Sequence, residues 1–450
     1  MSTSRLRASL RGRLVTPDDP DFDSRVHALA WNALPSPGAP CPAAIALVAD
    51  AADVQACVRF ARDAGMRVAV RSGGHHWSGI AIGDGALQLD LSALDGITVD
   101  AAARVAHVQP AVTNGALARC LGAQGLAFAY GHCPGVALGG YLLGGGLGWN
   151  PRQWDAACAG VVGAEVVTAD GELLYVSEQA HSDLFDAVRG AGPLFPGVVT
   201  RFTLALQPLP RAIHKRVLVY PAASAAGVGA SLDAVASTLS PNVEALCQVS
   251  ARGGDADCTV LATAFTDDAT QAHAVLAPFT DAACAPGASS HGGPSQVGFE
   301  DLFDAVGSLY PAQHRCLADT FWFDVPAATL LPTLAAMLAG APSTLSHALL
   351  VPGQPKSQVG MFSAPGGTYV VCYALWRDAA QDAENRRWFD DVTACLAIRA
   401  TGHYIGEAAL LGSHGQERLR GCYSEADWVR LAEVRRSHDP QGLFAGALFA

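Results

Sequence analysis

Short apolar runs and one amphipathic helix pattern open the chain. Residues 44–48 (AIALV) are a continuous apolar run of strand length, and residues 67–70 (RVAV) are a second one. Between them, apolar side chains recur at helical spacing from Asp53 until Gly65. This pattern predicts a strand, a helix and a strand in that order.

Further extended runs follow in the next part of the chain. Residues 97–108 and 163–177 each hold two strand-like runs around a polar turn, which indicates two hairpins. Residues 86–94 and 198–206 are single strand candidates. We therefore expect a domain that mixes helices and strands and ends near the proline pair of QPLPR at 207–211.

Beyond this proline pair the chain changes in character. Ala-rich helical stretches accompany strand candidates at 216–220 and 368–376, which predicts a separate layer of sheet and helices. The charged run at 382–391 is typical of an exposed helix face. Near the end, residues 428–437 have a helix pattern, and an apolar tail follows at 443–450.

Length and composition support a folded chain with more than one core. The 450 residues exceed the roughly 250 to 300 at which single cores stop growing, so we expect two packed domains. Half of the residues are apolar, 16% are charged and 47 are glycine, which favours a compact protein with many tight turns over a disordered one.

The charge balance argues against nucleic acid as a partner. The formal net charge is -12, from 29 basic and 41 acidic residues. No run of lysine and arginine is longer than a pair, as at Arg435 and Arg436 near the C-terminus. A surface that neutralises phosphates is therefore not expected.

Cysteine spacing and hydropathy bear on metals and location. The twelve cysteines are spread singly, without CxxC pairs or zinc-site spacings, so we expect no metal and mostly buried free thiols. No stretch reaches about 18 uninterrupted apolar residues, and the start of the chain has no apolar signal region. These features predict a cytoplasmic protein without a membrane partner, although the acid-free, Arg-bearing start leaves an organelle transit peptide open.

Two glycine-rich segments carry the strongest chemical signal. Residues 71–79 (RSGGHHWSG) place paired glycines after a strand, where backbone amides can approach a charged group such as a pyrophosphate. Residues 131–150 hold eight glycines in twenty positions, which indicates backbone running close to another group. Neither segment matches a P-loop or a GxGxxG that opens a helix, so a nicotinamide-dependent reductase is improbable.

Taken together, these segments resemble a known family. In order along the chain, they and the runs at 86–94, 166–174 and 189–202 follow one another as in the FAD-binding domain of the vanillyl-alcohol oxidase superfamily. The resemblance is greatest to its berberine bridge enzyme-like branch. It covers residues 10 to 210 strongly and residues 400 to 445 more loosely.

The resemblance implies a two-domain α+β fold of the PCMH type. The FAD-binding domain would comprise residues 1–210, with its core at about 38–210. Residues 211–399 would form a substrate-binding domain of antiparallel sheet covered by helices. Residues 400–450 would return to the FAD-binding domain.

Two residues are implied as covalent attachment points for FAD. The resemblance places His75 where the family bonds to the 8α-methyl carbon of the flavin, and Cys133 where part of the family bonds to C6. Val136 matches a position at which valine accompanies reactivity with oxygen. Tyr141 is a departure, because many members have His there, and its hydroxyl remains able to donate a hydrogen bond. The implied cofactor-binding residues are Arg71, Ser72, Gly73, Gly74, His75, His76, Gly79, Cys133, Val136, Gly139, Gly140, Tyr141, Gly144, Gly145, Gly146, Gly197, Val198 and Val199.

The catalytic candidates stand near the C-terminus. HYIGEAALL at 403–411 resembles a family segment written Y-x-N, which makes Tyr404 a candidate catalytic residue. Gly406 replaces the family Asn, and Glu407 after it is a candidate carboxylate partner or base. The ending SHDPQGLF at 437–444 resembles the family closure, with two substitutions.

The activity implied is that of an oxidase. Hydride would pass from a small organic substrate, such as an alcohol, a sugar or a secondary metabolite, to covalently bound FAD, and O2 would then be reduced to H2O2. Two alternatives stay open: a flavin dehydrogenase that uses another acceptor, and a flavin-carrying binding protein without catalysis of its own. For some polar and aromatic residues of the middle region we expect only core or solvated positions: Tyr310, His314, Arg315, Trp322, Tyr373 and Trp376.

Overall fold

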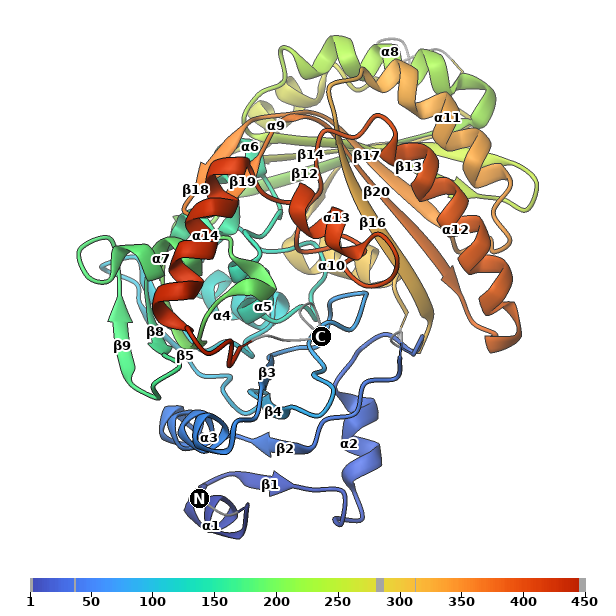
Figure 1. Ribbon diagram of the computed structural model, residues 1–450. Helices are drawn as coiled ribbons and strands as arrows, with labels where there is room; N and C mark the ends of the chain where they lie inside the picture. The colour runs from blue at the N-terminus through green and yellow to red at the C-terminus, as the bar shows by residue number, and fades with distance from the viewer. Residues whose placement is uncertain (1–2, 36–37, 281–286, 312, 445–450) are drawn as a thin grey trace.

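The fold combines three main sheets with helices (Figure 1). The computed structural model describes residues 3–35, 38–280, 287–311 and 313–444. The sheets have four, five and seven strands, and two further two-stranded ribbons accompany them. The expected mixture of helices and antiparallel sheet is confirmed.

The strand, helix and strand predicted first are β2 (Ala44–Leu47), α3 (Ala51–Ala64) and β3 (Val68–Arg71), and both strands belong to the four-stranded sheet. Its order is β1 (Arg13–Val15), β2, β4 (Leu87–Asp90) and β3, and β4 pairs in parallel with both β2 and β3. Helix α3 connects β2 to β3; the Asp50 carboxylate caps its start, and left-handed Gly65 ends it. Ligands bind at the carboxyl ends of parallel strands, and the glycine-rich segment 71–79 begins at the end of β3.

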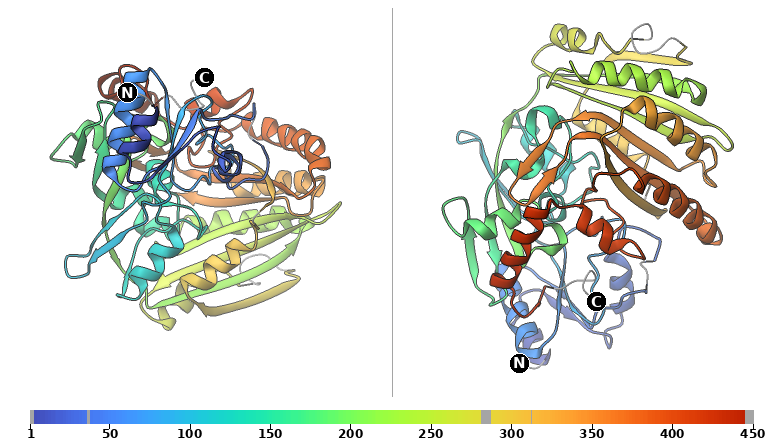
Figure 2. Two further views of the ribbon diagram at one scale, coloured as in Figure 1. Left: turned by 90° about the horizontal axis from the view of Figure 1, so that it is seen from below. Right: turned by 45° about the horizontal axis from the view of Figure 1, so that its top comes forward.

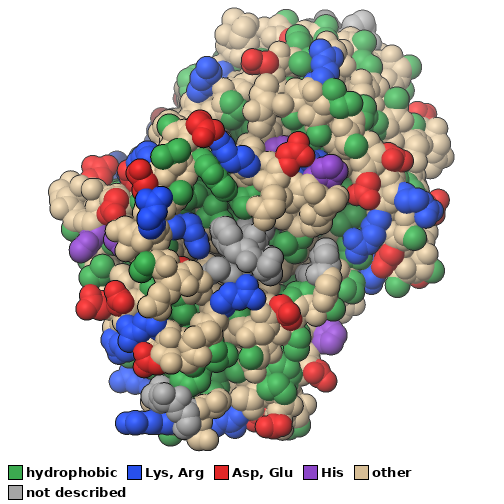
Figure 3. Space-filling view, in the orientation of Figure 1, with side chains coloured by type: hydrophobic (Ala, Val, Ile, Leu, Met, Phe, Trp, Pro, Cys, Tyr) green, Lys and Arg blue, Asp and Glu red, His purple; other side chains and the backbone are tan. Residues whose placement is uncertain are grey.

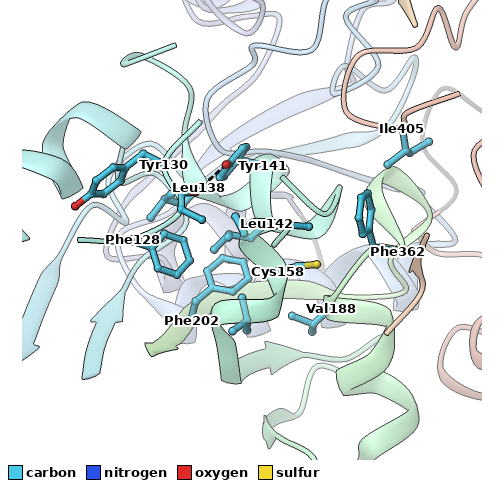
Figure 4. Packing of buried hydrophobic residues seen from close by; sticks show 14 of the residues in the cluster. Phe128, Tyr130, Leu138, Tyr141, Leu142, Cys158, Val188, Phe202, Phe362 and Ile405 are labelled. Carbon is cyan, nitrogen blue, oxygen red and sulfur yellow. Dashed lines mark hydrogen bonds between the residues drawn. The ribbon is translucent and has the colours of Figure 1, made fainter. Parts of the chain in front are cut away.

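The five-stranded sheet contains both predicted hairpins. Its order is β5 (Ile97–Asp100), β6 (Val105–Val108), β10 (Val198–Ala205), β8 (Val161–Val167) and β9 (Leu173–Val176), with every pair antiparallel. Helix α5 (Leu138–Leu143), from the second glycine-rich segment, packs its Leu138 and Leu142 into the core beside Phe202 and Cys158 (Figure 4). This burial anchors the second glycine-rich segment on the sheet.

Smaller elements complete this part of the chain. They are α1 (Thr3–Ser9), α2 (Phe22–Ala28), α4 (Asn114–Gly122), α6 (Pro151–Trp154), α7 (Ser182–Val188), and the short strands β7 (Leu126–Ala127) and β11 (Gln207–Pro208).

The seven-stranded sheet is antiparallel and is covered on one face by helices, as expected (Figures 1 and 2). Its order is β15 (Ser290–Val297), β12 (Ala212–Pro221), β14 (Ala256–Thr266), β13 (Val243–Ala251), β17 (His347–Gln354), β20 (Gly367–Trp376) and β16 (Arg315–Phe323). The helices are α8 (Ala225–Ala236), α9 (Ala269–Leu276), α11 (Ala327–Ala339) and α12 (Asp382–Ala397). The other face is turned toward the first part of the chain.

Helix α12 contains the charged run at 382–391. Its Phe389 and Asn385 are buried, whereas Glu384, Arg387 and Asp390 are exposed. The prediction of an exposed helix face is therefore confirmed.

The end of the chain lies against the first part. Helix α14 (Glu425–His438), which contains the predicted 428–437, packs beside α7, and the His438 imidazole contacts the Asp183 carboxylate at 2.7 Å. The Val68 amide donates to the Leu443 carbonyl at 2.8 Å. The boundaries predicted at 210 and 399 stay predictions, and residues 445–450 of the apolar tail lie outside the described residues.

The remaining elements are α10 (Phe299–Gly307), α13 (Gly415–Gly421), and the ribbon of β18 (Ser357–Val359) and β19 (Phe362–Ala364). In the described part of the chain, we find no helix with the length and apolar character needed to span a membrane. Basic and acidic side chains are interspersed on the face drawn in Figure 3.

Candidate active site

A cavity of about 730 Å³ lies between the glycine-rich segments and the open face of the seven-stranded sheet. Both glycine-rich segments contribute to its lining, as do residues 404–407 and several strands of the large sheet. Three parts of the chain that are far apart in sequence therefore meet around one cavity. A cavity of this size with a few polar groups suits a cofactor or another small ligand.

The segment 71–79 is held in place at its start by the Arg71 side chain and by a tight glycine turn. The Arg71 guanidinium pairs with the Asp90 carboxylate at 3.0 Å and also donates to the Gly73 carbonyl. Gly74 has φ +68°, and a Cβ there would overlap the carbonyl oxygen of Leu29. Glycine is therefore required at this turn, where the chain passes from β3 to the cavity.

His75 presents a neutral imidazole to the cavity. Its ring stacks on Trp31, with 5.7 Å between the ring centroids. Burial lowers the pKa of His75 to about 4, and the nearby Arg71 charge acts in the same direction. The unprotonated ring is the nucleophilic form, so His75 has this form at neutral pH.

The second glycine-rich segment lies against the first. A Cβ placed on Gly135 would be 3.5 Å from the His75 Nε2 atom, and one placed on Gly139 would be 2.6 Å from the Ser72 Oγ atom. Cys133, two residues before Gly135, also lines the cavity. Burial raises the pKa of the Cys133 thiol to about 12, with a further contribution from Glu407. The structure therefore places His75 and Cys133 on adjoining walls of one cavity.

Most of the predicted cofactor residues line the cavity, and three do not. Gly79, Gly145 and Gly146 lie outside its lining and have φ values of +68°, +96° and +81°, so they serve turns. Tyr141 lines the cavity, but its hydroxyl donates to the Ala129 carbonyl at 2.8 Å (Figure 4). The residues that do line it are Arg71, Ser72, Gly73, Gly74, His75, His76, Cys133, Val136, Gly139, Gly140, Tyr141, Gly144, Gly197, Val198 and Val199.

His76 joins the first glycine-rich segment to the loop of the catalytic candidates. Its Nδ1 accepts a hydrogen bond from the Ser78 amide, so Nε2 carries the proton and donates to the Ile405 carbonyl at 3.3 Å. Burial lowers the pKa of His76 to about 4. A neutral imidazole therefore fixes the distance between the two segments.

Tyr404 is fixed at both ends. Its amide donates to the Thr320 hydroxyl of β16 at 2.9 Å, and its own hydroxyl oxygen accepts from the amides of Gly146 and Leu147, each at 3.2 Å. Burial raises the pKa of Tyr404, although the two amides act in the opposite direction. The hydroxyl is protonated at neutral pH, which leaves its proton for a hydrogen bond into the cavity.

The Glu407 carboxylate is held by two tyrosines other than Tyr404, whose carbonyl accepts from the Glu407 amide at 3.1 Å. One carboxylate oxygen accepts from the Tyr373 hydroxyl at 2.8 Å, and the other accepts from the Tyr369 hydroxyl at 3.0 Å. Both tyrosines lie on β20, four residues apart, and so project from the same face of the sheet. Burial raises the pKa of each tyrosine, so both remain hydrogen-bond donors at neutral pH.

Some of the middle-region residues expected to be core or solvated also line the cavity. They are Tyr310, Trp322 and Tyr373, whereas His314, Arg315 and Trp376 lie outside the lining. Tyr310 donates to the Nε2 atom of His347 at 3.1 Å, because the Nδ1–H of that ring donates to the Leu345 carbonyl. Burial lowers the pKa of His347 to about 4.

Sequence reasoning missed a link between the second glycine-rich segment and the large sheet. The Glu244 carboxylate of β13 contacts the His132 Nε2 atom at 2.8 Å and accepts from the Asn150 amide at 2.9 Å. Burial is the largest single influence on the pKa of His132 and lowers it, but the charge of Glu244, its hydrogen bond and the charge of Glu407 together raise the pKa. Nothing local in the sequence signals this pair, since 112 positions separate the two residues.

The donor set around the cavity suits an organic cofactor and not a metal ion. Among the described residues, no group of three or more His, Cys, Asp or Glu side chains is arranged to hold a metal. Glycine lets the two segments pack together, since a Cβ on Gly73 or Gly139 would crowd the facing segment, and Gly140 lines the cavity with open space beside it. FAD fits these walls.

Comparison with known proteins agrees with this geometry. Residues 42–177 match the family described as FAD binding domain. The chain is 29% identical to the FAD-linked oxidoreductase nodO of Hypoxylon pulicicidum over 419 residues, which cover 91% of each chain.

Solved structures show the same fold over almost the whole length. The crystal structure of 6-hydroxy-D-nicotine oxidase from Arthrobacter nicotinovorans superposes with a TM-score of 0.86 and 25% identity, covering 99% of this chain and 98% of that one. A variant of berberine bridge enzyme superposes with a TM-score of 0.83 at 20% identity, covering 98% and 97%. The chain therefore contains an FAD binding domain at residues 42–177, shares the fold of berberine bridge enzyme and is an FAD-dependent oxidoreductase.

Proposed function

We propose that the chain is an oxidase that carries FAD covalently on His75 and Cys133 and oxidises a small alcohol-bearing substrate. The observation that carries this proposal is the meeting, around one cavity, of His75, Cys133 and a carboxylate held between two tyrosine hydroxyls. The overall reaction balances as alcohol plus O2 giving carbonyl compound plus H2O2.

The two attachment residues are suited to the family's two bonds. The neutral His75 ring would bond the 8α-methyl carbon of the flavin, and the Cys133 sulfur would bond C6. Each bond would replace a C–H bond of the flavin and the N–H or S–H bond of the residue, with two protons lost and two electrons passed through the flavin to O2. Support comes from the His75 ring lying against Gly135, next to the segment that carries Cys133. Bound FAD supplies the acceptor for the two electrons that leave the substrate carbon.

In this proposal Glu407 takes the proton of the substrate hydroxyl. The carboxylate has a fixed direction because Tyr369 and Tyr373 each donate to one of its oxygens. Tyr404 orients the same hydroxyl with its remaining proton, since its oxygen is already held by two amides. Glu407 and Tyr404 therefore act side by side, and the proton does not pass between them.

O2 is proposed as the electron acceptor. The half-buried Val136 lines the cavity, which supports the family association of valine with oxygen reactivity. The name of 6-hydroxy-D-nicotine oxidase, with its similar fold, also supports an oxidase. If another electron acceptor reoxidises the reduced flavin faster than O2 does, the chain is a dehydrogenase.

Oxygen consumption by the purified holoenzyme tests this proposal. A panel of alcohols, sugars and aromatic metabolites should contain substrates that consume O2, and added catalase should return half of it. Reduced holoenzyme that reacts slowly with O2 but rapidly with an artificial acceptor would contradict the oxidase. Absence of flavin reduction by every compound would favour a binding protein.

The role of Glu407 is tested with a substrate found in this way. Glu407→Gln should slow anaerobic flavin reduction by about 10²- to 10⁴-fold, the usual range for a lost general base. Glu417→Gln is the matched control, because the Glu417 side chain is 73% exposed on α13. Flavin reduction at the wild-type rate in Glu407→Gln would exclude Glu407 as the base.

A further inference from the structure

One face of the large sheet carries a charged residue at one end of the cavity. Lys215 of β12 pairs with Thr263 of β14, which pairs in turn with Glu244 of β13. All three line the cavity, because side chains directly opposite each other on neighbouring strands share a face. Lys215 is thus part of the wall that faces the glycine-rich segments.

The Lys215 ammonium has no partner among residues 3–35, 38–280, 287–311 and 313–444. Burial is the only cause that acts on its pKa, and it lowers that pKa. The neighbouring carboxylate, Glu244, already binds His132 and the Asn150 amide. Two strand spacings of about 4.8 Å also separate the Cα atoms of Lys215 and Glu244.

An unpaired ammonium in a cavity wall loses hydration without gaining a counter-charge. A ligand that brings one negative charge would restore the balance. The chain contains only two lysines, and the other, Lys356, is exposed and lies outside the cavity lining. The position of Lys215 in the cavity wall therefore points to binding of a charged ligand, since lysine is otherwise rare in this chain.

Leucine and valine side chains lie between Lys215 and the catalytic candidates, together with the polar Thr259 and Gln248 of β14 and β13. Leu261 and Leu246 of β14 and β13, then Leu349 and Val351 of β17, line the cavity between β12 and β20. Four strand spacings, or about 19 Å between Cα atoms, separate β12 from β20, and the side chains occupy part of this distance. A ligand that spans this wall has a charged end, an apolar body and a far end at Glu407.

We propose that Lys215 binds the carboxylate of an elongated substrate, whose apolar body lies along Leu261 and Leu246 and whose alcohol reaches Glu407. This inference rests on the proposed function for the position of the alcohol. A monocarboxylate is favoured over a phosphate ester because Lys215 is the only lysine or arginine that the described strands of the large sheet contribute to the lining, and the nearby His132 is already bound to Glu244. The glycine-rich segments, which fit the phosphates of FAD, form the opposite wall.

Binding to the holoenzyme tests this inference without turnover. The probes are 6-phenylhexanoate, its methyl ester and 6-phenylhexyl phosphate, titrated while the flavin absorbance is followed. The wild type should bind 6-phenylhexanoate at least tenfold more tightly than the ester. Lys215→Met should abolish this difference, Lys215→Arg should retain most of it, and the control Lys356→Met should leave it unchanged.

Several results would overturn the inference. One is equal binding of carboxylate and ester by the wild type, and another is an undiminished preference in Lys215→Met. Tighter binding of the phosphate than of the carboxylate would reject the monocarboxylate. Loss of flavin from folded Lys215→Met would assign the lysine to the cofactor instead. The comparison of carboxylate and ester binding by the wild type tests the inference even where a variant does not fold. Because the assay measures binding without turnover, its result does not depend on whether the chain is an oxidase.

Discussion

A buried ion pair positions the loop that carries the catalytic candidates. Asp319 of β16 accepts hydrogen bonds from the amides of Thr320 at 2.9 Å and Ala409 at 3.0 Å, and from the Arg418 Nε atom at 2.7 Å. The side chains of Asp319 and Arg418 are 1% and 5% exposed. Because Ala409 follows Glu407 by two residues, this carboxylate fixes the loop next to the cavity.

Asp319→Asn keeps the shape of the side chain and removes its charge, which leaves the Arg418 guanidinium buried without a counter-charge. Breaking a buried pair in this way costs about 3 to 5 kcal/mol of unfolding free energy. The oxygen that accepts from the Ala409 amide is kept in asparagine, but the NH2 group that replaces Oδ2 faces the Arg418 Nε–H and pushes the two side chains apart. This shifts the loop of Glu407 and Tyr404, and a displacement of about 1 Å can lower kcat about 100-fold. We therefore expect both stability and kcat to fall.

Urea titration followed by circular dichroism measures the stability, and oxygen consumption measures kcat. The double variant Asp319→Asn with Arg418→Met removes both charges and should be more stable than Asp319→Asn alone. Asp170→Asn is the control, because its carboxylate is 82% exposed and 3.6 Å from Arg62, where a change below about 0.5 kcal/mol is expected. An Asp319→Asn variant with the stability and kcat of the wild type would refute this reasoning.

Two further predictions concern the glycine wall and a buried imidazole. A Cβ on Gly148 would overlap the Tyr130 carbonyl oxygen and the Tyr141 hydroxyl, whereas a Cβ on Gly140 would meet no atom within 4 Å. Gly148→Ala should therefore purify with little flavin, and Gly140→Ala should purify with a normal flavin-to-protein absorbance ratio. The opposite order would show that this wall is not close-packed. Burial lowers the pKa of His347 from its usual value of 6.5 to about 4 in the folded protein. Between pH 6.5 and pH 4 the imidazole is therefore protonated in the unfolded chain but not in the folded one. The free energy of unfolding should fall as the pH decreases through this range. His347→Phe should flatten that decline in urea titrations; an unchanged slope would contradict the assignment.

The glycine-rich segments and the two candidate attachment residues within them could be located in the sequence because their signals are local. The two hairpins and the strand, helix and strand order around α3 follow from periodicity within short windows. His75 and Cys133 stand inside motifs whose order along the chain carries the resemblance to the berberine bridge enzyme-like branch. Their convergence on one cavity matches what the resemblance implies.

The opposite wall could not be predicted, because it depends on strand order and register. The strands of the large sheet are not in chain order, and a register shift of one residue would turn Tyr369, Tyr373 and Lys215 to the other face. The partners of Glu407 come from β20, more than thirty residues earlier in the chain. Sequence reasoning could propose Tyr404 and Glu407 as a pair. Only the folded structure shows that the side chain of each is hydrogen-bonded to groups other than the side chain of its neighbour.

Mass spectrometry of the acid-denatured protein tests the central claim most directly. Covalent FAD on His75 and Cys133 predicts that the intact chain retains the mass of FAD and that digestion gives one flavin linked to both peptides. His75→Ala and Cys133→Ala should each retain flavin through the remaining bond, the double variant should release it all, and the control Cys120→Ala should behave as the wild type. Complete release of unmodified FAD from the wild-type chain on acid treatment would contradict the covalent linkage.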